Sequence, residues 1–280
     1  MKRWLITGAS RGLGRAFAQA ALERGDRVAM TSRDPRQLNE LVARFADAAI
    51  VLPLDLTRTA EIRSVFDQAV RRLGHLDVVV NNAGYILLGA IEEMAEDEAR
   101  EQVETLFFGP LFLTQAAVNH MRERGNGGAI IQVSSLAGVG ALPGNSMYAA
   151  SKWALEGMSE ALRQEVKDFG IRVVILQPAG IRTDIGHGVR QSRPLPAYDP
   201  VMKEQRKRWA SGEDHNATGD PKRCAQVLLE LVDRPDPPFR LALGASGAEV
   251  GRMLWRQRIE ESEAWDQVSR RVNIPTEPHN

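Results

Sequence analysis

The chain has 280 residues, of which 43% are hydrophobic and 26% charged, an ordinary composition for a globular protein. Its 36 basic and 36 acidic residues give zero formal net charge, so nothing in the charge balance argues for nucleic acid or an anionic membrane as a partner, and we expect a small-molecule ligand. No apolar run approaches the roughly 18 to 20 residues of a membrane span, and MKRWLITGAS is too poor in apolar residues for a signal peptide. We therefore expect one large domain in the cytoplasm.

Short apolar runs alternate with longer helical patterns along most of the chain. The runs with the composition of buried strands are RWLI, RVAMTS, AIVLPL, LDVVV, AIIQV, IRVVIL and FRLAL. Helical patterns begin near residues 11, 36, 58, 97, 147 and 220. This alternation predicts an α/β fold, a Rossmann-like doubly wound parallel seven-stranded sheet with helices on both faces. Its ligand crevice lies beyond the carboxyl ends of the strands.

A glycine-rich segment, TGASRGLG at residues 7–14, directly follows the first strand and opens the first helix. Gly8, Gly12 and Gly14 allow a tight turn, and the helix start offers free amides and a favourable dipole to a phosphate. The segment therefore predicts a site for a dinucleotide pyrophosphate. The same letters contain Gly8-x-Ser10-x-Gly12, the nucleophile elbow of α/β-hydrolases, but a hydrolase elbow comes after several strands rather than the first.

Two arginines indicate which dinucleotide is bound. At the end of the second strand, where a carboxylate would accept hydrogen bonds from a ribose 2′-hydroxyl, the chain has Ser32 and Arg33. Arg33, together with Arg11 in the glycine loop, would supply forked cationic donors to a 2′-phosphate. The pair predicts NADP(H), with Asp34 as the carboxylate that would instead favour NAD.

The segment from Val133 to Lys152 brings a hydroxyl, a phenol and an ammonium together. Ser135 lies where the fifth strand ends, and Tyr148 and Lys152 are four residues apart, so both project from one helix face. A lysine charge one turn away lowers the pKa of the phenol, so Tyr148 becomes usable as a general acid or base. Taken alone, Tyr-x-x-x-Lys is more often an ordinary helix turn, because this spacing arises frequently by chance.

Three further strand ends carry turn-forming motifs. Asp55 follows the third strand, NNAG (Asn81–Gly84) the fourth, and QPAGIRT (Gln177–Thr183) lies at the sixth. Asn-Asn-Ala-Gly suits a turn where the backbone passes close to a ribose, and Pro-Ala-Gly ends the strand so that Thr183 could meet a carboxamide. Each motif by itself also suits a plain strand-to-helix turn.

In this order and spacing the motifs closely resemble the short-chain dehydrogenase/reductase family, over residues 1 to about 245. The resemblance rests on TGASRGLG, NNAG, Ser135 thirteen residues before Tyr148, YAASK and PAGIRT. It implies an NADPH-dependent reductase of ketones or aldehydes, reversible to alcohol oxidation. Ser135 would orient the substrate carbonyl, Tyr148 would protonate the forming alkoxide, and Lys152 would bind the nicotinamide ribose and lower the pKa of the tyrosine.

The resemblance also implies a set of ligand-binding residues. Asp55 would meet the adenine, and Asn82 to Gly84 would line the adenosine ribose. The cofactor-binding positions are Gly8, Ser10, Arg11, Gly12, Leu13, Gly14, Arg33, Asp55, Leu56, Asn82, Ala83, Gly84, Tyr148, Lys152, Pro178, Gly180, Ile181 and Thr183. We expect Tyr85 and Leu142 to line the substrate pocket.

One position departs from the family pattern. Members usually carry an asparagine three residues before the glycine of a segment like LFFGPL, where it helps hold a water that links the lysine to solvent. Counting back from Gly109 gives Leu106, which cannot hydrogen-bond. The alternative function is therefore a non-catalytic nucleotide-binding protein with a decayed reductase site. If the site is active, we expect Thr105, Asn81, a backbone carbonyl or a water to replace the asparagine.

The C-terminal part has weaker patterns. Residues 184–219 hold prolines and glycines without clear periodicity, which predicts a mobile flap over the substrate. Residues 246–272 predict an amphipathic helix, in an extension to residue 280 packed on the same domain. It could cap the pocket or meet a second subunit of a homodimer or homotetramer. The apolar side of that helix carries Trp255, Ile259, Ser262, Trp265 and Val268.

Cysteine and histidine give no sign of a metal or redox site. The one cysteine, Cys224, excludes an intrachain disulfide and lies in the apolar pattern of a helix core. His187, His215 and His279 share no ligand spacing, so we infer no metal.

Overall fold

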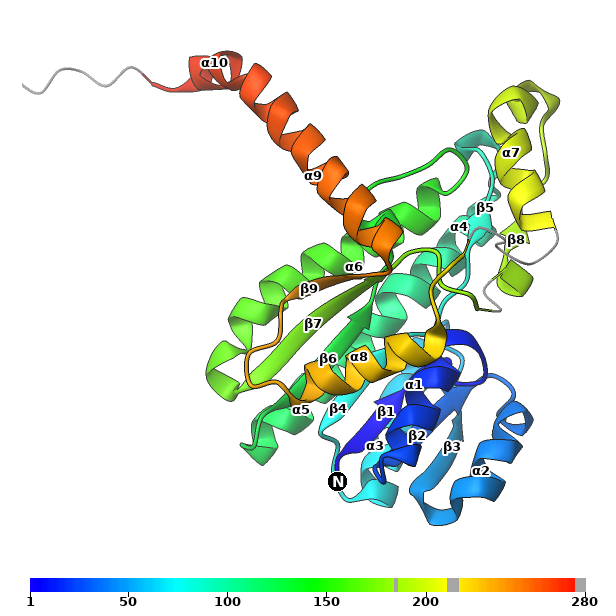
Figure 1. The fold of residues 1–280 in the computed structure, drawn as a ribbon, viewed down its shortest axis with the longest axis vertical. Coiled ribbons are helices and arrows are strands. Elements are labelled where there is room, and N and C mark those ends of the chain that lie inside the picture. Colours follow the sequence, from blue (N-terminus) through cyan, green and yellow to red (C-terminus); the bar gives the residue numbers. More distant parts are fainter. Residues whose placement is uncertain (184–185, 211–216, 275–280) are drawn as a thin grey trace, which may run out of the picture.

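The computed structural model describes residues 1–183, 186–210 and 217–274, and of residue 187 only the backbone. Within these ranges the chain forms one main sheet, a short second ladder and a series of helices (Figure 1). The strands are β1 (Arg3–Ile6), β2 (Arg27–Ser32), β3 (Ala49–Pro53), β4 (Val78–Asn81), β5 (Leu87–Leu88), β6 (Gly128–Val133), β7 (Ile171–Pro178), β8 (Arg190–Gln191) and β9 (Arg240–Leu243). The helices are α1 (Gly12–Glu23), α2 (Asn39–Phe45), α3 (Thr59–Leu73), α4 (Glu96–Val103), α5 (Gly109–Arg124), α6 (Ser146–Glu165), α7 (Asp199–Ala210), α8 (Pro221–Asp233), α9 (Ala245–Ala264) and α10 (Asp266–Ser269).

The main sheet has seven strands in the order β3-β2-β1-β4-β6-β7-β9, and every neighbouring pair is parallel. The chain winds outward from β1 in one direction through β2 and β3, and then in the other direction from β4 to β9. The predicted doubly wound fold is confirmed. The strand order reverses between β1 and β4, which places a ligand crevice beyond the carboxyl ends of these two strands.

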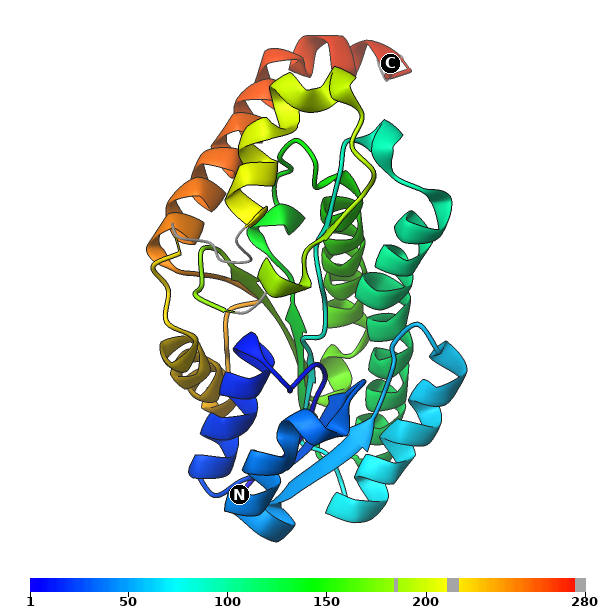
Figure 2. The ribbon, with the colours of Figure 1, turned by 90° about the vertical axis from the view of Figure 1, so that its right-hand side faces the viewer.

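Two hydrophobic layers sandwich the sheet. Trp4 and Ile6 of β1 pack with α1, α2 and α8 on one face, whereas Leu5 packs with α3, α5 and α6 on the other. Figure 2 shows α1 and α8 on one side of the strands and α3 and α5 on the other. Burial on both faces explains why these strands read as continuous apolar runs rather than as alternating ones. Cys224 of α8 is buried in the first of these layers, as predicted.

Helices α4 and α5 join without a loop, through a five-residue π-helical segment from Glu104 to Phe108. A π segment widens the helix by one residue and is frequent at functional sites. Leu106, the residue that replaces the usual asparagine, lies within this segment and is fully buried.

In the part that the structure describes, the flap contains more regular secondary structure than the sequence predicted. β8 pairs in parallel with β5, and residues 199–210 form α7. The sequence analysis did not predict α7, because DPVMKEQRKRWA is mostly polar and has no apolar stripe. Met202 is its buried residue. Residues 184–185 and 211–216 of the predicted flap lie outside the described residues.

The C-terminal extension packs on the domain only through its first turns. Gly247 and Gly251 of α9 are buried, and Arg258 donates a hydrogen bond to the carbonyl of Val139. Beyond this point α9 and α10 project away from the body (Figure 1). Trp265 is 61% exposed and Ile259 is 54% exposed. The outer half of the predicted helix is thus exposed, and an apolar stripe does not by itself reveal what covers it.

None of the helices in the described part of the chain combines the length and the apolarity needed to cross a membrane.

Because the glycine loop is closely packed, we expect an added methyl group there to lower the free energy of unfolding. A Cβ on Gly14 would lie 2.3 Å from the carbonyl oxygen of Gly8, whereas a Cβ on Gly157, in the middle of α6, would meet nothing within 4 Å. Gly14→Ala should lower the free energy of unfolding by about 1–3 kcal/mol through overpacking. Gly157→Ala, the control, should raise it by about 0.5–1 kcal/mol because alanine favours the helix. Urea denaturation measures both; a Gly14→Ala protein as stable as the parent would contradict the packing described.

Candidate active site

The glycine loop is fastened to the turn that follows β4. The side-chain amide of Asn82 donates to the carbonyls of Thr7 (2.9 Å) and Gly8 (3.2 Å), and the amides of Asn82 and Ala83 donate to the Thr7 hydroxyl (2.9 and 3.1 Å). Gly8 has φ +63°, and a Cβ there would lie 2.7 Å from the Cα of Ala83. The two motifs thus form one surface at the carboxyl ends of neighbouring strands, and only glycine fits at position 8.

The N-terminus of α1 opens onto the same surface. Arg11 is its N-cap residue and makes no capping hydrogen bond with its side chain, so the first amides of α1 have no side-chain partner. Gly12 faces Thr183, whose Cβ would lie 3.4 Å from a Cβ at position 12. The Arg11 guanidinium lies against Gly188. The fold therefore brings the PAGIRT segment and the start of the flap to the glycine loop, as predicted from their places at strand ends.

Beyond β2, the charges of Asp34 and Arg33 have different environments. Asp34 accepts hydrogen bonds from Nε (2.9 Å) and Nη2 (3.0 Å) of Arg36. The same guanidinium holds the pKa of Asp34 below its usual value. Arg33 is exposed and donates no hydrogen bond to any residue that the structure describes. The competing carboxylate is thus engaged by its neighbour, whereas the Arg33 guanidinium is available to a ligand.

The segment after β3 is held by its own side chains. One carboxylate oxygen of Asp55 accepts from the amide (3.0 Å) and the hydroxyl (2.8 Å) of Thr57. Leu56 is buried against Gly109 at the start of α5. Asp55 is therefore fixed at the rim of the crevice, and Leu56 is a packing residue of its wall.

Ser135, Tyr148 and Lys152 meet as predicted. Ser135 follows β6. Its hydroxyl accepts from the amide of Ala137 at 3.1 Å and lies close enough to the Tyr148 phenol to influence its pKa. Lys152 Nζ lies 5.8 Å from the centre of the Tyr148 ring and donates to the carbonyl of Val133 at 2.7 Å. Only 8% of Tyr148 and 5% of Lys152 are exposed. The site thus holds a proton donor, a hydroxyl and a charge in a nearly dry environment.

Burial dominates the ionisation of this pair. It raises the pKa of Tyr148 above its usual value, and the hydrogen bond from Ser135 acts in the opposite direction. Burial also lowers the pKa of Lys152 to about 8, and the charge of Glu156 opposes this change. The prediction of a lowered pKa for the phenol is therefore not met, because removal from water outweighs the stabilisation of a phenolate.

The apolar surroundings of Tyr148 include the unusual leucine. Tyr148 and Leu106 belong to one buried cluster with Ile86, Ala137 and Ala149. The Leu106 side chain also packs against Gly84, where a Cβ would lie 2.7 Å from its Cδ2. Leucine at this position thus tightens the packing between the π segment and the turn after β4.

A backbone carbonyl partners the lysine, as one of the predicted replacements for the asparagine. The partner is Val133, at 2.7 Å. Asn81, another candidate, instead donates to Thr114 (3.0 Å) and Gln132 (2.9 Å), in a buried network between β4, β6 and α5. The ammonium therefore has a fixed protein partner in spite of Leu106.

The two predicted substrate residues have different positions. Tyr85 is buried, its hydroxyl has no hydrogen-bond partner among the described residues, and burial raises its pKa to about 12. The guanidinium carbon of Arg190 lies 4.5 Å from the centre of its ring. Leu142 is 54% exposed in the loop before α6 and lies outside the apolar cluster around Tyr148. Tyr85 thus borders the site through the flap strand β8, and Leu142 is at most part of its outer rim.

Sequence reasoning missed two sets of residues. Val189 and Trp209 of the flap pack against the cluster that contains Tyr148. Trp209 is the one aromatic residue of the α7 sequence, which was the available signal. Glu156 was also missed, although it continues the four-residue spacing of Tyr148 and Lys152.

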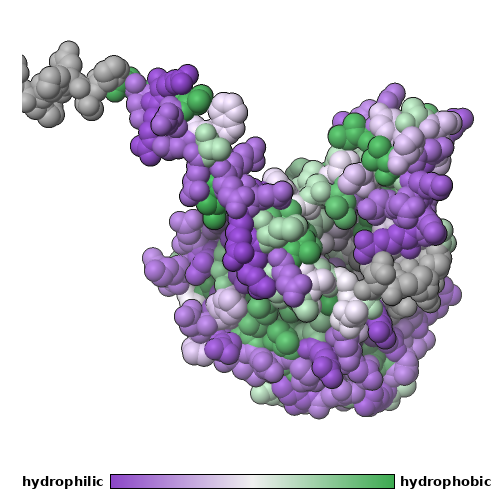
Figure 3. Space-filling view, turned by 45° about the horizontal axis from the view of Figure 1, so that its top comes forward, coloured by the Kyte–Doolittle hydropathy of each residue, from purple (hydrophilic) through white to green (hydrophobic). Residues whose placement is uncertain are grey.

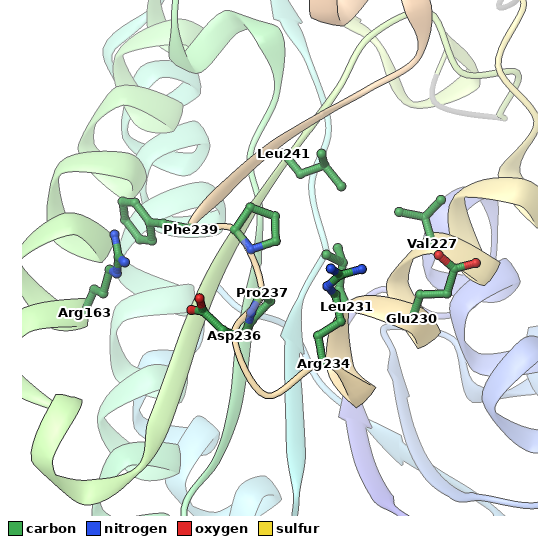
Figure 4. A pocket seen from close by; sticks show the side chains of 10 residues that line it. Arg163, Val227, Glu230, Leu231, Arg234, Asp236, Pro237, Phe239 and Leu241 are labelled. Carbon is green, nitrogen blue, oxygen red and sulfur yellow. The ribbon is translucent and has the colours of Figure 1, made fainter.

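A pocket of about 620 Å³ lies elsewhere, between α6, α8 and the loop that leads to β9 (Figure 4). It opens at the amino end of β9, away from the strand ends that carry Ser135. Its walls mix both signs of charge, with Arg163, Glu230, Arg234 and Asp236. We assign it no part in the chemistry of the site.

The described residues give no sign of a metal site. These residues contain no group of three or more His, Cys, Asp or Glu side chains placed to hold a metal ion. His215, His279 and the side chain of residue 187 lie outside what the structure describes.

Known proteins resemble this chain over nearly its whole length. A family model described as short chain dehydrogenase matches residues 2–194. Oxidoreductase BOA17 of Botryotinia fuckeliana is 35% identical over 273 residues, which cover 96% of this chain and 98% of that protein. A 3-ketodihydrosphingosine reductase of Bacteroides thetaiotaomicron is 34% identical over 241 residues, 86% of this chain and 87% of that protein. The solved structure of a short-chain dehydrogenase from Streptomyces avermitilis has 38% identity and a TM-score of 0.90, covering 97% of this chain and 98% of the other.

Proposed function

Since the chain belongs to the short-chain dehydrogenase family, whose oxidoreductases use nicotinamide cofactors, we propose that it reduces a ketone or aldehyde to an alcohol with NADPH, reversibly. The observation that carries the proposal is the buried contact of Ser135, Tyr148 and Lys152. A hydroxyl, a phenol and an ammonium in one dry site suit proton transfer to a carbonyl oxygen.

The residues present fit a dinucleotide. Gly8 and Gly12 both have positive φ, and the amides of the first turn of α1 have no side-chain cap, a combination that suits a pyrophosphate. The turn Asn82–Gly84 and Asp55 would hold the adenosine half, and Thr183 and Lys152 the nicotinamide half. When bound, the nicotinamide would supply the hydride that reduces the carbonyl carbon.

The protein's own residues manage the substrate oxygen and the proton. Ser135 donates a hydrogen bond to the carbonyl oxygen and holds it beside the phenol. Because the pKa of Tyr148 is raised, the phenol is protonated near neutral pH and can give its proton to the oxygen as the alcohol forms. The Lys152 ammonium, held by the Val133 carbonyl, stabilises the phenolate that remains.

Removal of the phenol hydroxyl tests this role. Tyr148→Phe keeps the packing of the ring but removes the proton donor, so kcat should fall by at least about a hundredfold. Cofactor affinity, measured by fluorescence titration, should change little. Tyr198→Phe, on the exposed flap, is the matched control and should keep full activity. A Tyr148→Phe protein that retained more than a tenth of the parent rate would sink the mechanism.

The preference for NADPH is supported by the charges beyond β2. Asp34, the residue able to accept hydrogen bonds from a ribose, is engaged by Arg36, whereas Arg33 and Arg11 remain available as donors. A 2′-phosphate would gain charge-assisted hydrogen bonds from both arginines.

The cofactor prediction follows from these bonds. A charge-assisted hydrogen bond contributes about 1.5–3 kcal/mol, so Arg33→Ala should reduce the NADPH-to-NADH ratio of kcat/KM roughly 10- to 150-fold. Arg44→Ala, an exposed arginine of α2 that pairs with Glu23, is the control and should leave the ratio unchanged. Equal kcat/KM for both cofactors in the parent enzyme would refute the NADPH assignment.

The surroundings of Tyr148 favour a substrate with an apolar body. Leu106, Val189 and Trp209 pack in or against the cluster around the phenol. Figure 3 shows apolar side chains gathered on the face between α9 and α7. The relative named for reducing 3-ketodihydrosphingosine supplies one ketone for a first panel of substrates.

Two alternatives are tested by the same panel. A non-catalytic nucleotide-binding protein, the reading that Leu106 favours, would bind NADPH without turning over any carbonyl. The α/β-hydrolase reading of Ser10 is disfavoured because its loop follows β1 and its hydroxyl makes no hydrogen bond to a histidine within the described chain.

We further propose a homodimer in which α9 pairs with α9 of a second copy. Trp255 and Ile259 are 45% and 54% exposed on the projecting helix. Arg252 and Arg256 lie before Ile259, and Glu260 follows it at the start of an acidic stretch. Antiparallel pairing about a two-fold axis would set the basic half of each helix against the acidic half of the other.

The oligomer prediction targets the apolar stripe. Ile259→Glu should convert the dimer into monomers, because it places a charge at the centre of the pair. Light scattering after size-exclusion chromatography measures the mass of each species. Val201→Glu, at a 57% exposed position on α7, should leave the dimer intact. A parent protein that is monomeric at tens of micromolar would contradict this assembly.

A further inference from the structure

The helix that carries the catalytic phenol and ammonium continues with a buried carboxylate. Tyr148, Lys152 and Glu156 are spaced by four residues on α6, so they lie along one face of the helix. Glu156 is only 5% exposed, and the mechanism described above does not use it. Removing a carboxylate from water costs free energy unless the group is paired and hydrogen-bonded, so its partners are informative.

Both oxygens of Glu156 accept hydrogen bonds from three other elements. Oε1 accepts from the Ser134 hydroxyl at 2.7 Å and from the Gln177 amide at 2.9 Å. Oε2 accepts from the same amide at 3.0 Å and from Nε of Arg240 at 3.1 Å. A Cβ on Gly138 would lie 2.5 Å from Oε1, so the space beside the carboxylate is closed. The group is thus fixed in place by donors that stabilise negative charge.

Opposite charges continue from Glu156 to the surface. Nη2 of Arg240 donates to Oε2 of Glu160 at 2.7 Å. The side chain of Glu160 is 61% exposed, whereas that of Glu156 is 6% exposed. The order along this line is carboxylate, guanidinium and carboxylate, from the buried Glu156 to solvent.

We propose that Glu156 is a positioning residue that keeps the Lys152 ammonium charged beside Tyr148. The inference rests on the proposed function of this site and extends it. Where Leu106 removes the usual polar side chain, the Val133 carbonyl orients the ammonium and the Glu156 charge offsets its burial.

Among the groups near Lys152 that the structure describes, Glu156 is the one that carries a negative charge. From α6 they are Tyr148, a neutral phenol near pH 7, and Glu156; from β6 and its following loop they are the Val133 carbonyl and Ser135. Leu106 of the π segment, which packs in the same cluster as Tyr148, is apolar. Glu156 is the charge that raises the pKa of Lys152, against the lowering to about 8 that burial causes. Loss of that charge should therefore lower the pKa further.

The test is Glu156→Gln, which keeps the shape and removes the charge. Titration of the Lys152 side chain by NMR in ¹⁵N-lysine-labelled protein should move to lower pH by about one unit or more. The alkaline limb of kcat/KM for carbonyl reduction should move the same way, because the fraction of charged Lys152 falls at a lower pH. Glu160→Gln is the matched control: it also contacts Arg240 but is exposed, and should shift the titration by less than about 0.3 unit.

Two further variants guard against a folding defect. Glu156→Asp retains the charge and should titrate closer to the parent than Glu156→Gln does. Arg240→Gln, at the edge strand β9, removes the cation that shares Glu156, so the Lys152 titration should move to higher pH even if Glu156→Gln does not fold. An unchanged Lys152 titration in Glu156→Gln, or in Arg240→Gln where the first variant does not fold, would overturn the role of Glu156.

The NMR titration needs no turnover. Failure of the parent enzyme to reduce any carbonyl would therefore overturn the proposed function while leaving the coupling of Lys152 and Glu156 measurable.

Discussion

The burial of the Lys152 ammonium is the constraint on which the site depends. A charge out of water needs fixed partners, and here the Val133 carbonyl accepts a hydrogen bond from the ammonium, while the charge of Glu156, one turn further along α6, offsets part of the cost of burial. These partners require β6, β7 and β9 to lie in their observed order, because Ser134, Gln177 and Arg240 hold Glu156 from these strands or the residues that follow them. The strand order of the sheet thus determines which residues surround Glu156.

The same low polarity keeps the phenol of Tyr148 protonated near neutral pH. A phenol whose pKa is raised by burial is a proton donor near neutral pH, which suits reduction of a carbonyl. Leu106 contributes to this environment, because it fills the space between the π segment and Tyr148 with hydrocarbon. The residue that departs from the family pattern therefore belongs to the apolar wall of the site, and the lysine donates its hydrogen bond to a main-chain carbonyl.

The crevice itself follows from the winding of the chain. Parallel strands bring all their carboxyl ends to one edge, so the glycine loop, the turn after β4 and Thr183 meet although they are far apart in sequence. The flap is joined to this edge through β8 and through Trp209, and α9 leaves from the end of β9 beside it. The flap and α9 thus both lie around the same opening.

The sequence by itself determined the strands, the parallel sheet and the residues Ser135, Tyr148 and Lys152, because these depend on local apolar runs, on glycine conformations and on helix spacing. Only the tertiary structure decided how these groups ionise, because the pKa of Tyr148 depends on burial by residues from distant elements. It also decided the partner of Lys152 and the course of α9, since a main-chain carbonyl has no signature in the letters and an amphipathic stripe does not specify what it packs against. The polar helix α7 was not predicted for a related reason. Its few apolar contacts, such as that of Trp209, are made with residues distant in the sequence.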